Sequence, residues 1–440
     1  MVERFFLVFS AETLSGLARF TKFVQRSSKI CAVKFLDLLF KDASSERGMS
    51  LLDYSNELLV VHDVSASTTA VDKRFNDYAV QFLRRLVNIL FCAQIRTPFD
   101  DSFLRPYSAV RIWDSTKIEL PEHMAADFPG FGGGASAAGI SIQYRYDLKN
   151  GVASSLDVYP ATSSDSGYAK EIPVEKNALE IFDLGYVSVD FLSRLDEGGN
   201  YYVCRLHSQA DVYNLDGQKF DLEKIYRWMR LYRIPVYQKK VLVGQKLLPT
   251  RLVIHLVDEQ TYQKRLKNAR KDAGKRGWQI SDQHKLRMRM NLMITNTDSE
   301  DIPAENVYML YKFRWQIELI FMTWKSAGWN LEKIKEVKYE RYMCVMYAKL
   351  LMIIISERIY AVIAAQRYSM DKKILSREKC VKTMCRQINL LRQLINTEAH
   401  TICEILNKIS NIFARGHILC KRKNRENYSN LVELFIYKSK

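Results

Sequence analysis

The spacing of apolar residues changes near residue 100, and this change constrains the fold more than any other feature of the chain. Before it, residues 32–40 and 80–91 carry apolar side chains at the three- and four-residue intervals of a helix. Pro98 and Pro106 mark the boundary, after which apolar and polar residues alternate as in β-strands. The chain therefore combines an N-terminal helical region with a sheet.

Beyond the boundary, the pattern predicts a mixed sheet in an α/β domain. Residues 138–146 and 152–159 alternate, and the Asn150-Gly151 pair between them is a strong signal for a hairpin turn. Ser188 is expected to cap a helix that ends just before Gly198. Further strands are expected at residues 109–113, 179–182, 201–206, 236–243, 251–258 and 291–295.

The last third of the chain returns to helical spacing. Pro303 suits the first turn of a helix, and we expect that helix to run to about Gly328. A second long helix is expected from about Leu331 to Tyr368. The remaining 70 residues or so also read as helices. They end in a basic tail that contains Lys421, Arg422, Lys423 and Arg425.

The N-terminal helices allow two interpretations. Residues 51–59 form a short helix pattern, and a break at residues 62–65 precedes Ser67 or Thr68, either of which suits an N-cap. The next helix would run through Lys73, Arg74 and Phe75. Helix, turn and basic helix is the outline of a helix-turn-helix that binds DNA, but an ordinary helical bundle fits equally well.

The charge balance points to a polyanionic partner. The 440 residues contain 66 Lys and Arg against 49 Asp and Glu, a net charge of +17 with a pI near 9.3. Such a surplus favours nucleic acid first and an anionic membrane surface second, although a basic protein without such a partner is also possible. Ten cations fall close together around Trp278, which suggests a surface that follows phosphates. They are Lys264, Arg265, Lys267, Arg270, Lys271, Lys275, Arg276, Lys285, Arg287 and Arg289.

Several other functional classes lack their sequence signals. The eight cysteines form no Cys-x-x-Cys pair, so a zinc site is not expected. Single cysteines scattered along the chain instead indicate reduced thiols in a cytosolic protein. The apolar run at residues 5–9 is too short for a signal peptide, and residues 345–355 are too few to span a bilayer. No phosphate-binding loop, dinucleotide fingerprint or nucleophile elbow is present.

Two acids follow apolar strand patterns. Asp114 comes directly after residues 109–113, and Asp183 comes directly after residues 179–182. In open α/β sheets, functional groups collect at the carboxyl ends of strands, so the two carboxylates could share divalent cations. Each alone also fits ordinary turn chemistry, in which Asp commonly follows a strand.

A third acid lies in the helix pattern of residues 311–325. With about 100° per residue, Tyr311, Arg314, Glu318 and Lys325 fall within an arc of roughly 60°. Four apolar residues lie on the opposite face and predict a buried stripe. They are Phe313, Ile317, Ile320 and Trp324.

The polar face of this helix has a structural and a functional interpretation. The structural one is a solvated surface with an ordinary Arg314–Glu318 pair one turn apart. The functional one assigns metal binding to Glu318 and phosphate binding to Arg314 and Lys325, with Tyr311 donating a hydrogen bond to a phosphate oxygen. A single carboxylate among cations favours the functional interpretation, because solvated faces usually carry several acids.

These four residues resemble the Tyr-x2-Arg-x3-Glu-x6-Lys signature of the insertion-sequence-four family of bacterial DDE transposases, and all four positions match without a gap. The segment Trp113-Asp114-Ser115-Thr116 resembles the family's first catalytic Asp segment. The family's second catalytic Asp segment is similar to Phe182-Asp183-Leu184-Gly185-Tyr186 followed by Tyr202-Val203-Cys204-Arg205-Leu206. In the family the second Asp precedes this Tyr-Val-x-Arg-Leu strand, and this order favours Asp183 over Asp190 and Asp211. The resemblance covers about residues 70–360.

The resemblance implies an α/β fold with a ribonuclease H-like mixed sheet, interrupted by a β-rich insertion and flanked by helical N-terminal and C-terminal regions. The expected division is a helical DNA-binding region, a first part of the catalytic core, a β-rich basic insertion, the remainder of the core with the Glu helix, and a helical basic C-terminal region. In that order, these are residues 1–100, 101–206, 207–298, 299–370 and 371–440.

The resemblance also implies a catalytic triad. Asp114, Asp183 and Glu318 would bind two Mg²⁺ ions about 4 Å apart, with Mn²⁺ as an expected substitute, and cleave and join DNA by in-line phosphoryl transfer. The expected partners are terminal inverted repeats and target DNA, with a homodimer pairing two ends and no membrane. The setting would be the bacterial cytoplasm, at the nucleoid. Trp278 would either stack on an unpaired base or anchor the basic segment.

Three other functions compete with this hypothesis. A non-catalytic DNA-binding protein derived from a transposase would keep the fold without the chemistry. A nuclease without joining activity would use the same triad. A basic protein at anionic membranes would bind liposomes without metal dependence, but the chain shows no basic amphipathic anchor helix.

Overall fold

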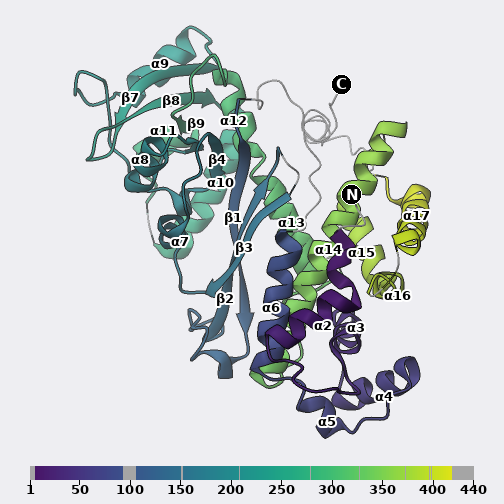
Figure 1. Ribbon diagram of the computed structural model, residues 1–440. Coiled ribbons are helices and arrows are strands. Elements are labelled where there is room, and N and C mark those ends of the chain that lie inside the picture. Colours follow the sequence, from purple (N-terminus) through teal and green to yellow (C-terminus); the bar gives the residue numbers. More distant parts are fainter. Residues whose placement is uncertain are drawn as a thin grey trace.

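The computed structural model describes residues 5–92, 106–149, 152–207, 209–277, 279–326, 328–371, 373–395, 397 and 399–418. Figure 1 shows a sheet-containing part and a helical part, connected by helices that run from one into the other. The expected hairpin turn at Asn150-Gly151, the basic tail, Pro98 and Trp278 lie outside the described residues.

The N-terminal region is helical, as predicted, but the helix-turn-helix outline is wrong in its second helix. Ser67 does cap that helix, but the helix ends at Asp72, and Lys73 and Arg74 lie in the turn that follows. A five-residue helix is too short to cross a DNA groove in the helix-turn-helix manner. The elements are η1 (Leu7–Phe9), α2 (Ala11–Phe20), α3 (Ala32–Ala43), α4 (Leu51–His62), α5 (Thr68–Asp72) and α6 (Asp77–Cys92).

One mixed sheet of nine strands organises the middle of the chain, in the order β3-β2-β1-β4-β5-β9-β8-β7-β6. Strands β1, β4 and β5 are parallel, and the remaining pairings are antiparallel. The strands are β1 (Ala109–Leu120), β2 (Ala138–Asp147), β3 (Val152–Pro160), β4 (Ala178–Phe182), β5 (Tyr201–Arg205), β6 (Val212–Tyr213), β7 (Val236–Val243), β8 (Leu248–Leu256) and β9 (Met290–Thr295). The predicted mixed α/β sheet is confirmed.

Helices and 3-10 turns join these strands. They are η2 (Glu122–Met124), α7 (Asp165–Glu171), η3 (Leu184–Tyr186), α8 (Val189–Glu197), α9 (Leu222–Leu231), α10 (Glu259–Arg276) and α11 (Asp282–Met288). Ser188 caps α8 as predicted, since its side chain accepts a hydrogen bond from the backbone N–H of Phe191 at 3.2 Å. Strands β7 and β8 do not leave the sheet, because β8 pairs with β9 and β9 pairs with β5.

The C-terminal helices differ from the prediction in two places. The expected helix from Pro303 to Gly328 is broken at Phe313 and Arg314, and the next long helix begins only at Tyr339. The elements are α12 (Ala304–Lys312), α13 (Trp315–Ser326), α14 (Tyr339–Asp371), α15 (Arg377–Arg386), α16 (Ile388–Arg392) and α17 (Ala399–Gly416). Among the described residues, we find no helix with both the length and the apolar character needed to cross a membrane.

The sheet separates two hydrophobic cores. Ile112 and Ile118 of β1 face the larger core, which contains the apolar sides of α12, α13, α14 and the N-terminal helices. Trp113 points to the opposite core, together with Phe182 and residues of α8. Because successive strand residues alternate between faces, Asp114 shares the face of Ile112 and is directed toward the helices of the larger core.

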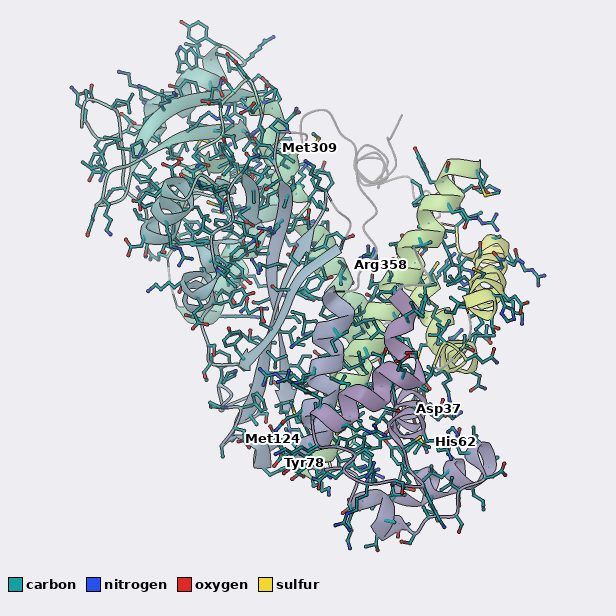
Figure 2. All side chains as sticks on the ribbon, viewed as in Figure 1. Asp37, His62, Tyr78, Met124, Met309 and Arg358 are labelled. Carbon is teal, nitrogen blue, oxygen red and sulfur yellow. The ribbon has the colours of Figure 1, made fainter. Side chains whose placement is uncertain are left out.

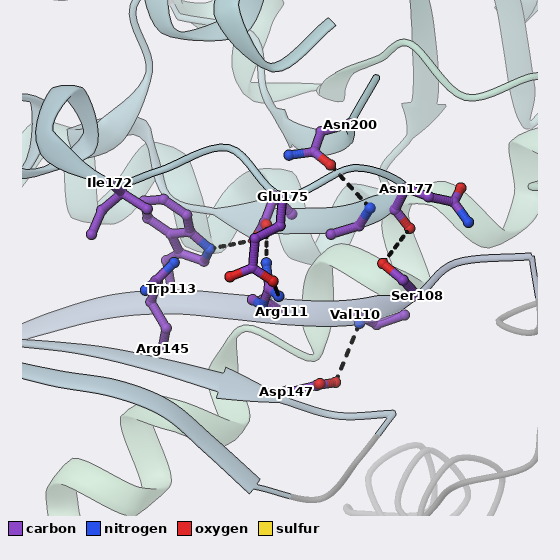
Figure 3. Close-up of polar contacts among 12 residues, drawn as sticks. Ser108, Val110, Arg111, Trp113, Arg145, Asp147, Ile172, Glu175, Asn177 and Asn200 are labelled. Carbon is purple, nitrogen blue, oxygen red and sulfur yellow. Dashed lines mark hydrogen bonds and ion pairs between the residues drawn. The ribbon is translucent and has the colours of Figure 1, made fainter. Parts of the chain in front are cut away.

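A buried carboxylate fixes β1 against β4. Glu180 accepts a hydrogen bond from Arg111 Nη1 at 2.9 Å and another from Trp113 Nε1 at 2.6 Å. Arg111 also pairs with Glu175, and Figure 3 shows these two side chains next to each other. Charge-assisted hydrogen bonds in a buried setting are strong, so this contact helps to set the register of the two parallel strands.

An ion network joins α3 and α4, in the N-terminal region, to α16, in the C-terminal region. Arg392 of α16 contacts both carboxylate oxygens of Asp37, at 2.6 and 2.7 Å, and pairs with Glu57 at 2.7 Å. His62 lies 2.9 Å from the same Asp37 carboxylate, and Figure 2 shows the two residues in the lower helices. The network ties the N-terminal helices to the C-terminal ones.

Lys349 of α14 is a buried cation without a carboxylate partner within salt-bridge distance among the described residues. Its Nζ donates to the backbone carbonyl oxygens of Trp329, Asn330 and Lys333 at 2.7 to 3.1 Å. Burial lowers the pKa of Lys349 to about 8. Lys349 therefore satisfies the backbone of the segment between α13 and α14, where no regular helix supplies donors.

We expect Lys349→Met to lower the free energy of unfolding by about 2 to 4 kcal/mol, because one buried and two partly buried carbonyl groups lose their donor. Urea unfolding at pH 7 measures this loss. The matched control is Lys408→Met on the exposed side of α17, which should stay within about 0.5 kcal/mol of the wild type. Equal effects of the two changes would contradict the structural role of Lys349.

Candidate active site

The parallel pairing of β1 and β4 places two acids side by side. Trp113 lies opposite Phe182 in the register, so Asp114 and Asp183 follow at the same level on neighbouring strands. The prediction that Asp183 directly follows its strand is confirmed. The same prediction for Asp114 is wrong, because β1 continues to Leu120.

The continuation of β1 has a tertiary cause. Residues 114–120 keep pairing with β2, so that Asp114 lies opposite Tyr144. Beyond it, Ile118 and Leu120 are buried in the larger core. Asp114 therefore lies within a long strand, where the continued pairing with β2 restricts its position.

The break between α12 and α13 brings the third acid and its neighbours to the same place. The backbone N–H of Arg314 bonds to Tyr311 O at 3.1 Å, and that of Ile317 bonds to Arg314 O at 3.0 Å. These three-residue intervals form a tight turn instead of a continuous α-helix. Tyr311 thus lies in the last turn of one helix, which ends at Lys312, while Glu318 lies in the first turn of the next.

The helical-wheel argument for a single polar face is consequently wrong in part. Tyr311 is buried, and Arg314 belongs to neither helix. The opposite stripe is confirmed, because four predicted core residues are fully or almost fully buried. They are Phe313, Ile317, Ile320 and Trp324.

Arg314 is the centre of the constellation. Its Nη1 lies 2.7 Å from Asp114 Oδ2, and its Nη2 lies 2.5 Å from Glu318 Oε1. The side chains of Arg314 and Asp114 are 14% and 15% exposed, whereas that of Glu318 is 38% exposed. One half-buried guanidinium therefore joins two carboxylates that lie two hundred residues apart.

The electrostatics of the site are dominated by burial and by this arginine. Burial raises the pKa of Asp114 to about 7, with Glu318 and Asp183 adding to the rise and Arg314 opposing it. Burial by itself would lower the pKa of Arg314, but the Asp114 and Asp183 carboxylates outweigh it and the net shift is upward. Glu318 and Asp183 are thus close enough to Asp114 for their negative charges to raise its pKa.

Asp183 is held by a second partner. Tyr311 donates its hydroxyl hydrogen to Asp183 Oδ1 at 2.7 Å. Burial tends to raise the pKa of Asp183, but Tyr311, Arg314 and Arg205 together hold it below its usual value. Arg205, at the end of β5, lies 5.1 Å from the Tyr311 ring centroid and adds positive charge at this edge.

Lys325 lies in the last turn of α13, the helix that carries Glu318 in its first turn, and contacts other groups. Its Nζ donates to the carbonyl oxygen of Lys117 at 2.7 Å and lies 2.9 Å from Glu332 Oε1. Lys117 in turn stacks on the exposed ring of Phe131, 4.3 Å from its centroid. Direct contacts around Arg314 and Tyr311 therefore join five of the six predicted site residues, and Lys325 contacts a different part of the structure.

The chemistry of the donor set fits hard divalent cations, because Mg²⁺ and Mn²⁺ prefer carboxylate oxygens. In the described part of the chain, however, no three His, Cys, Asp or Glu side chains converge closely enough to hold an ion together. Arg314 and Tyr311 contact the carboxylates in this arrangement. Asp114, Asp183 and Glu318 therefore fit a divalent cation by chemical type, but in this arrangement they accept hydrogen bonds from Arg314 and Tyr311 and do not converge on one point.

Three residues near the site were not predicted to contribute to it. Arg205, Lys117 and Glu332 each contact a predicted site residue. Arg205 had a signal, since it ends the strand next to that of Asp183. Lys117 contributes a backbone carbonyl and Glu332 lies in an irregular segment, so neither carries a recognisable sequence pattern.

Comparison with known proteins finds similarity to transposases over most of the chain. A family model described as a transposase DDE domain matches residues 108–355. The transposase for insertion sequence element IS231F of Bacillus thuringiensis subsp. israelensis is 30% identical, over 91% of this chain and 88% of the relative. The transposase for element IS1151 of Clostridium perfringens is 27% identical, over 97% and 94%. The transposase for element IS231E of Bacillus thuringiensis subsp. finitimus is 29% identical, over 92% and 88%.

The raised pKa of Asp114 predicts a pH-dependent stability. Below the unfolded value of 3.8 both states are protonated, whereas between 3.8 and about 7 only the folded state keeps the proton. The stabilisation is therefore lost as the pH rises through 7. Relative to Asp114→Asn, the wild type should lose up to roughly 4 kcal/mol between pH 4 and pH 8.

Urea unfolding of both proteins at pH 4.5, 6 and 8 measures this difference, and Asp272→Asn on the exposed surface of α10 is the control. A difference between wild type and Asp114→Asn that stays constant over this range would show that Asp114 does not hold a proton in the folded protein.

Proposed function

Because this chain belongs to the DDE transposases, in the insertion-sequence-four group, and is thus an enzyme that acts on DNA, we propose that it binds the ends of its element and performs divalent-metal-dependent strand cleavage and strand transfer. The proposal is carried by one observation. Asp114, Asp183 and Glu318 come from three distant segments and meet around Arg314 and Tyr311.

We propose a ribonuclease H-like catalytic core for the sheet. The order β3-β2-β1-β4-β5, with three antiparallel strands followed by two parallel crossovers, supports this assignment. The proposed core comprises residues 101–206 and 299–370, with residues 207–298 as a basic insertion. Residues 1–100 would be a DNA-binding region and residues 371–440 a basic helical extension.

Asp114, Asp183 and Glu318 would hold two divalent cations, with Mg²⁺ as the expected ion and Mn²⁺ as a substitute. When bound, the ions would supply charge stabilisation to the attacking and leaving oxygens of a phosphodiester. The acids have a second role as hydrogen-bond acceptors that hold Arg314 and Tyr311 in place. No Ser or Tyr nucleophile is required, because a water or a DNA 3′-hydroxyl attacks the phosphorus in line.

Arg314, Lys325 and Tyr311 would bind the DNA backbone next to the scissile phosphate. A guanidinium matches phosphate oxygens with two parallel hydrogen bonds, and an ammonium acts as a point charge. Such contacts position the duplex without reading its sequence. The net charge of +17 would add a long-range attraction for DNA.

The proposed partners follow from this chemistry. Terminal inverted repeats and target DNA would bind to the same catalytic core in succession, and a homodimer would pair the two ends. The protein would act at the nucleoid in the bacterial cytoplasm.

We expect Glu318→Gln to abolish Mg²⁺-dependent cleavage while duplex DNA with the element's terminal sequence still binds. The loss should be at least about 10³-fold, since the amide cannot replace a carboxylate that carries charge in the transition state. Nicking and joining of a labelled plasmid, scored separately, measure both activities. Joined products distinguish a transposase from a nuclease without joining activity.

The matched control is Glu300→Gln, an equally conservative change at an exposed position before α12. It should leave cleavage, joining and DNA binding unchanged. Cleavage retained by Glu318→Gln would exclude Glu318 from the triad.

We expect Lys325→Ala to weaken binding of the same duplex and to reduce the salt dependence of the affinity by about one phosphate contact. Glu332→Gln should have the opposite effect on affinity, because Lys325 then loses its competing carboxylate. Fluorescence anisotropy between 50 and 300 mM salt measures the DNA affinity of each variant and the slope of its logarithm against the logarithm of the salt concentration. An unchanged slope in Lys325→Ala would mean that Lys325 does not contact the DNA backbone.

A further inference from the structure

We propose that Arg314 competes with divalent cations for the carboxylates of Asp114 and Glu318, and that it is released to a DNA phosphate as the cation binds. This proposal rests on the proposed function, since it uses the same three acids. It assigns to Arg314 a positioning role, in which one side chain couples metal binding to DNA binding.

The first support is the geometry of the guanidinium. Nη1 and Nη2 donate to different carboxylates, at 2.7 Å to Asp114 and at 2.5 Å to Glu318. The oxygens that would ligate a cation are therefore hydrogen-bonded to the permanently charged guanidinium of Arg314. A divalent ion bound to both acids must displace Arg314 or accept its repulsion at close range.

The second support is the backbone position of Arg314. It lies in the turn between α12 and α13 and belongs to neither helix. Its side chain can change direction by rotating about its own bonds, without unwinding either element. The apolar neighbours Phe313 and Ile317 remain buried in the core and hold the turn itself in place.

The third support is an unused donor. Arg314 Nε is buried and has no hydrogen-bond partner among the residues that the structure describes. Buried donors without partners are costly, so the guanidinium is not fully satisfied by the two acids. A phosphate offers several oxygens with one charge, and an arginine can use Nε together with one Nη to bind it in a bidentate manner.

Lys325 shows why this role is specific to Arg314. Both cations belong to the same segment of the chain. Lys325, however, donates to the carbonyl of Lys117 and pairs with Glu332, and it contacts none of the three acids. Its removal should change DNA binding without releasing a proposed metal ligand.

Coupling between the two ligands follows by linkage. A cation that displaces Arg314 makes the guanidinium available to DNA, and DNA that binds the guanidinium frees the carboxylates for the cation. Each ligand must then raise the affinity for the other by the same factor. The proposal thus predicts that a substitution at Arg314, which binds no metal itself, changes the affinity of the protein for a divalent cation.

The experiment is a titration of the DNA-free full-length protein with Mn²⁺, followed by electron paramagnetic resonance of the free ion. Arg314→Gln should bind Mn²⁺ about tenfold more tightly than the wild type, because charge-assisted hydrogen bonds no longer have to be broken. Lys325→Gln should change the affinity by less than about twofold. Asp114→Asn should weaken the binding and thereby identify the site.

Arg314→Lys separates competition from a general electrostatic effect. Lysine keeps the charge but cannot hold both carboxylates with separate nitrogens. Competition predicts about threefold tighter Mn²⁺ binding for Arg314→Lys, consistent with the loss of part of the hydrogen bonding. A general field effect predicts the wild-type affinity. Circular dichroism confirms that each variant is folded.

A second titration measures the coupling with DNA. Mn²⁺ affinity is compared with and without a pre-cleaved duplex that carries the terminal sequence, in the wild type and in Arg314→Gln. The duplex should raise the affinity of the wild type several-fold more than that of the variant. If the duplex raises the Mn²⁺ affinity of the two proteins by the same factor, the proposed release of Arg314 to a DNA phosphate is wrong.

The outcomes distinguish this inference from the proposed function. If Asp114→Asn binds Mn²⁺ as well as the wild type does, the acids are not the metal site and the proposed function fails. If Asp114→Asn loses binding while both Arg314 variants bind as the wild type or more weakly, the proposed function stands and competition by Arg314 is excluded.

Discussion

The parallel pairing of β1 with β4 is the constraint on which the rest of the site depends. Glu180 binds Arg111 and the Trp113 indole and holds the two strands in one register. The residues that follow the pair Trp113 and Phe182 are then forced together, and both are acids. A slip by one residue would turn one of the acids to the opposite core, because side chains alternate between the faces of a sheet.

The site combines burial with a balance of charge. Three half-buried carboxylates would repel one another, and Arg314 and Tyr311 offset that repulsion with direct hydrogen bonds. The proposed DNA-binding groups are therefore also the groups that keep the acids in place. Metal binding, DNA binding and the local stability of the fold are not independent in such an arrangement, since each uses the same few donors and acceptors.

Much of the architecture could be predicted from local patterns, and the failures share one cause. The mixed sheet, strand β7 and the Ser188 cap follow from periodicity and capping chemistry. The length of β1 was missed although Pro121 directly follows its last residue, Leu120, and no Pro or Gly marks the break before α13. Pairing with β2 extends the strand, and contacts of Tyr311 and Arg314 with two strands favour the tight turn.

The sequence by itself determined which groups the protein can use: three acids, two cations and a phenol in a spacing that identifies the family, within a strongly basic chain. Only the tertiary structure decided that Arg314 lies between Asp114 and Glu318, and that Tyr311 binds Asp183. The physical reason is that spacing along a chain specifies local geometry, whereas hydrogen bonds between residues more than a hundred positions apart depend on how strands and helices pack.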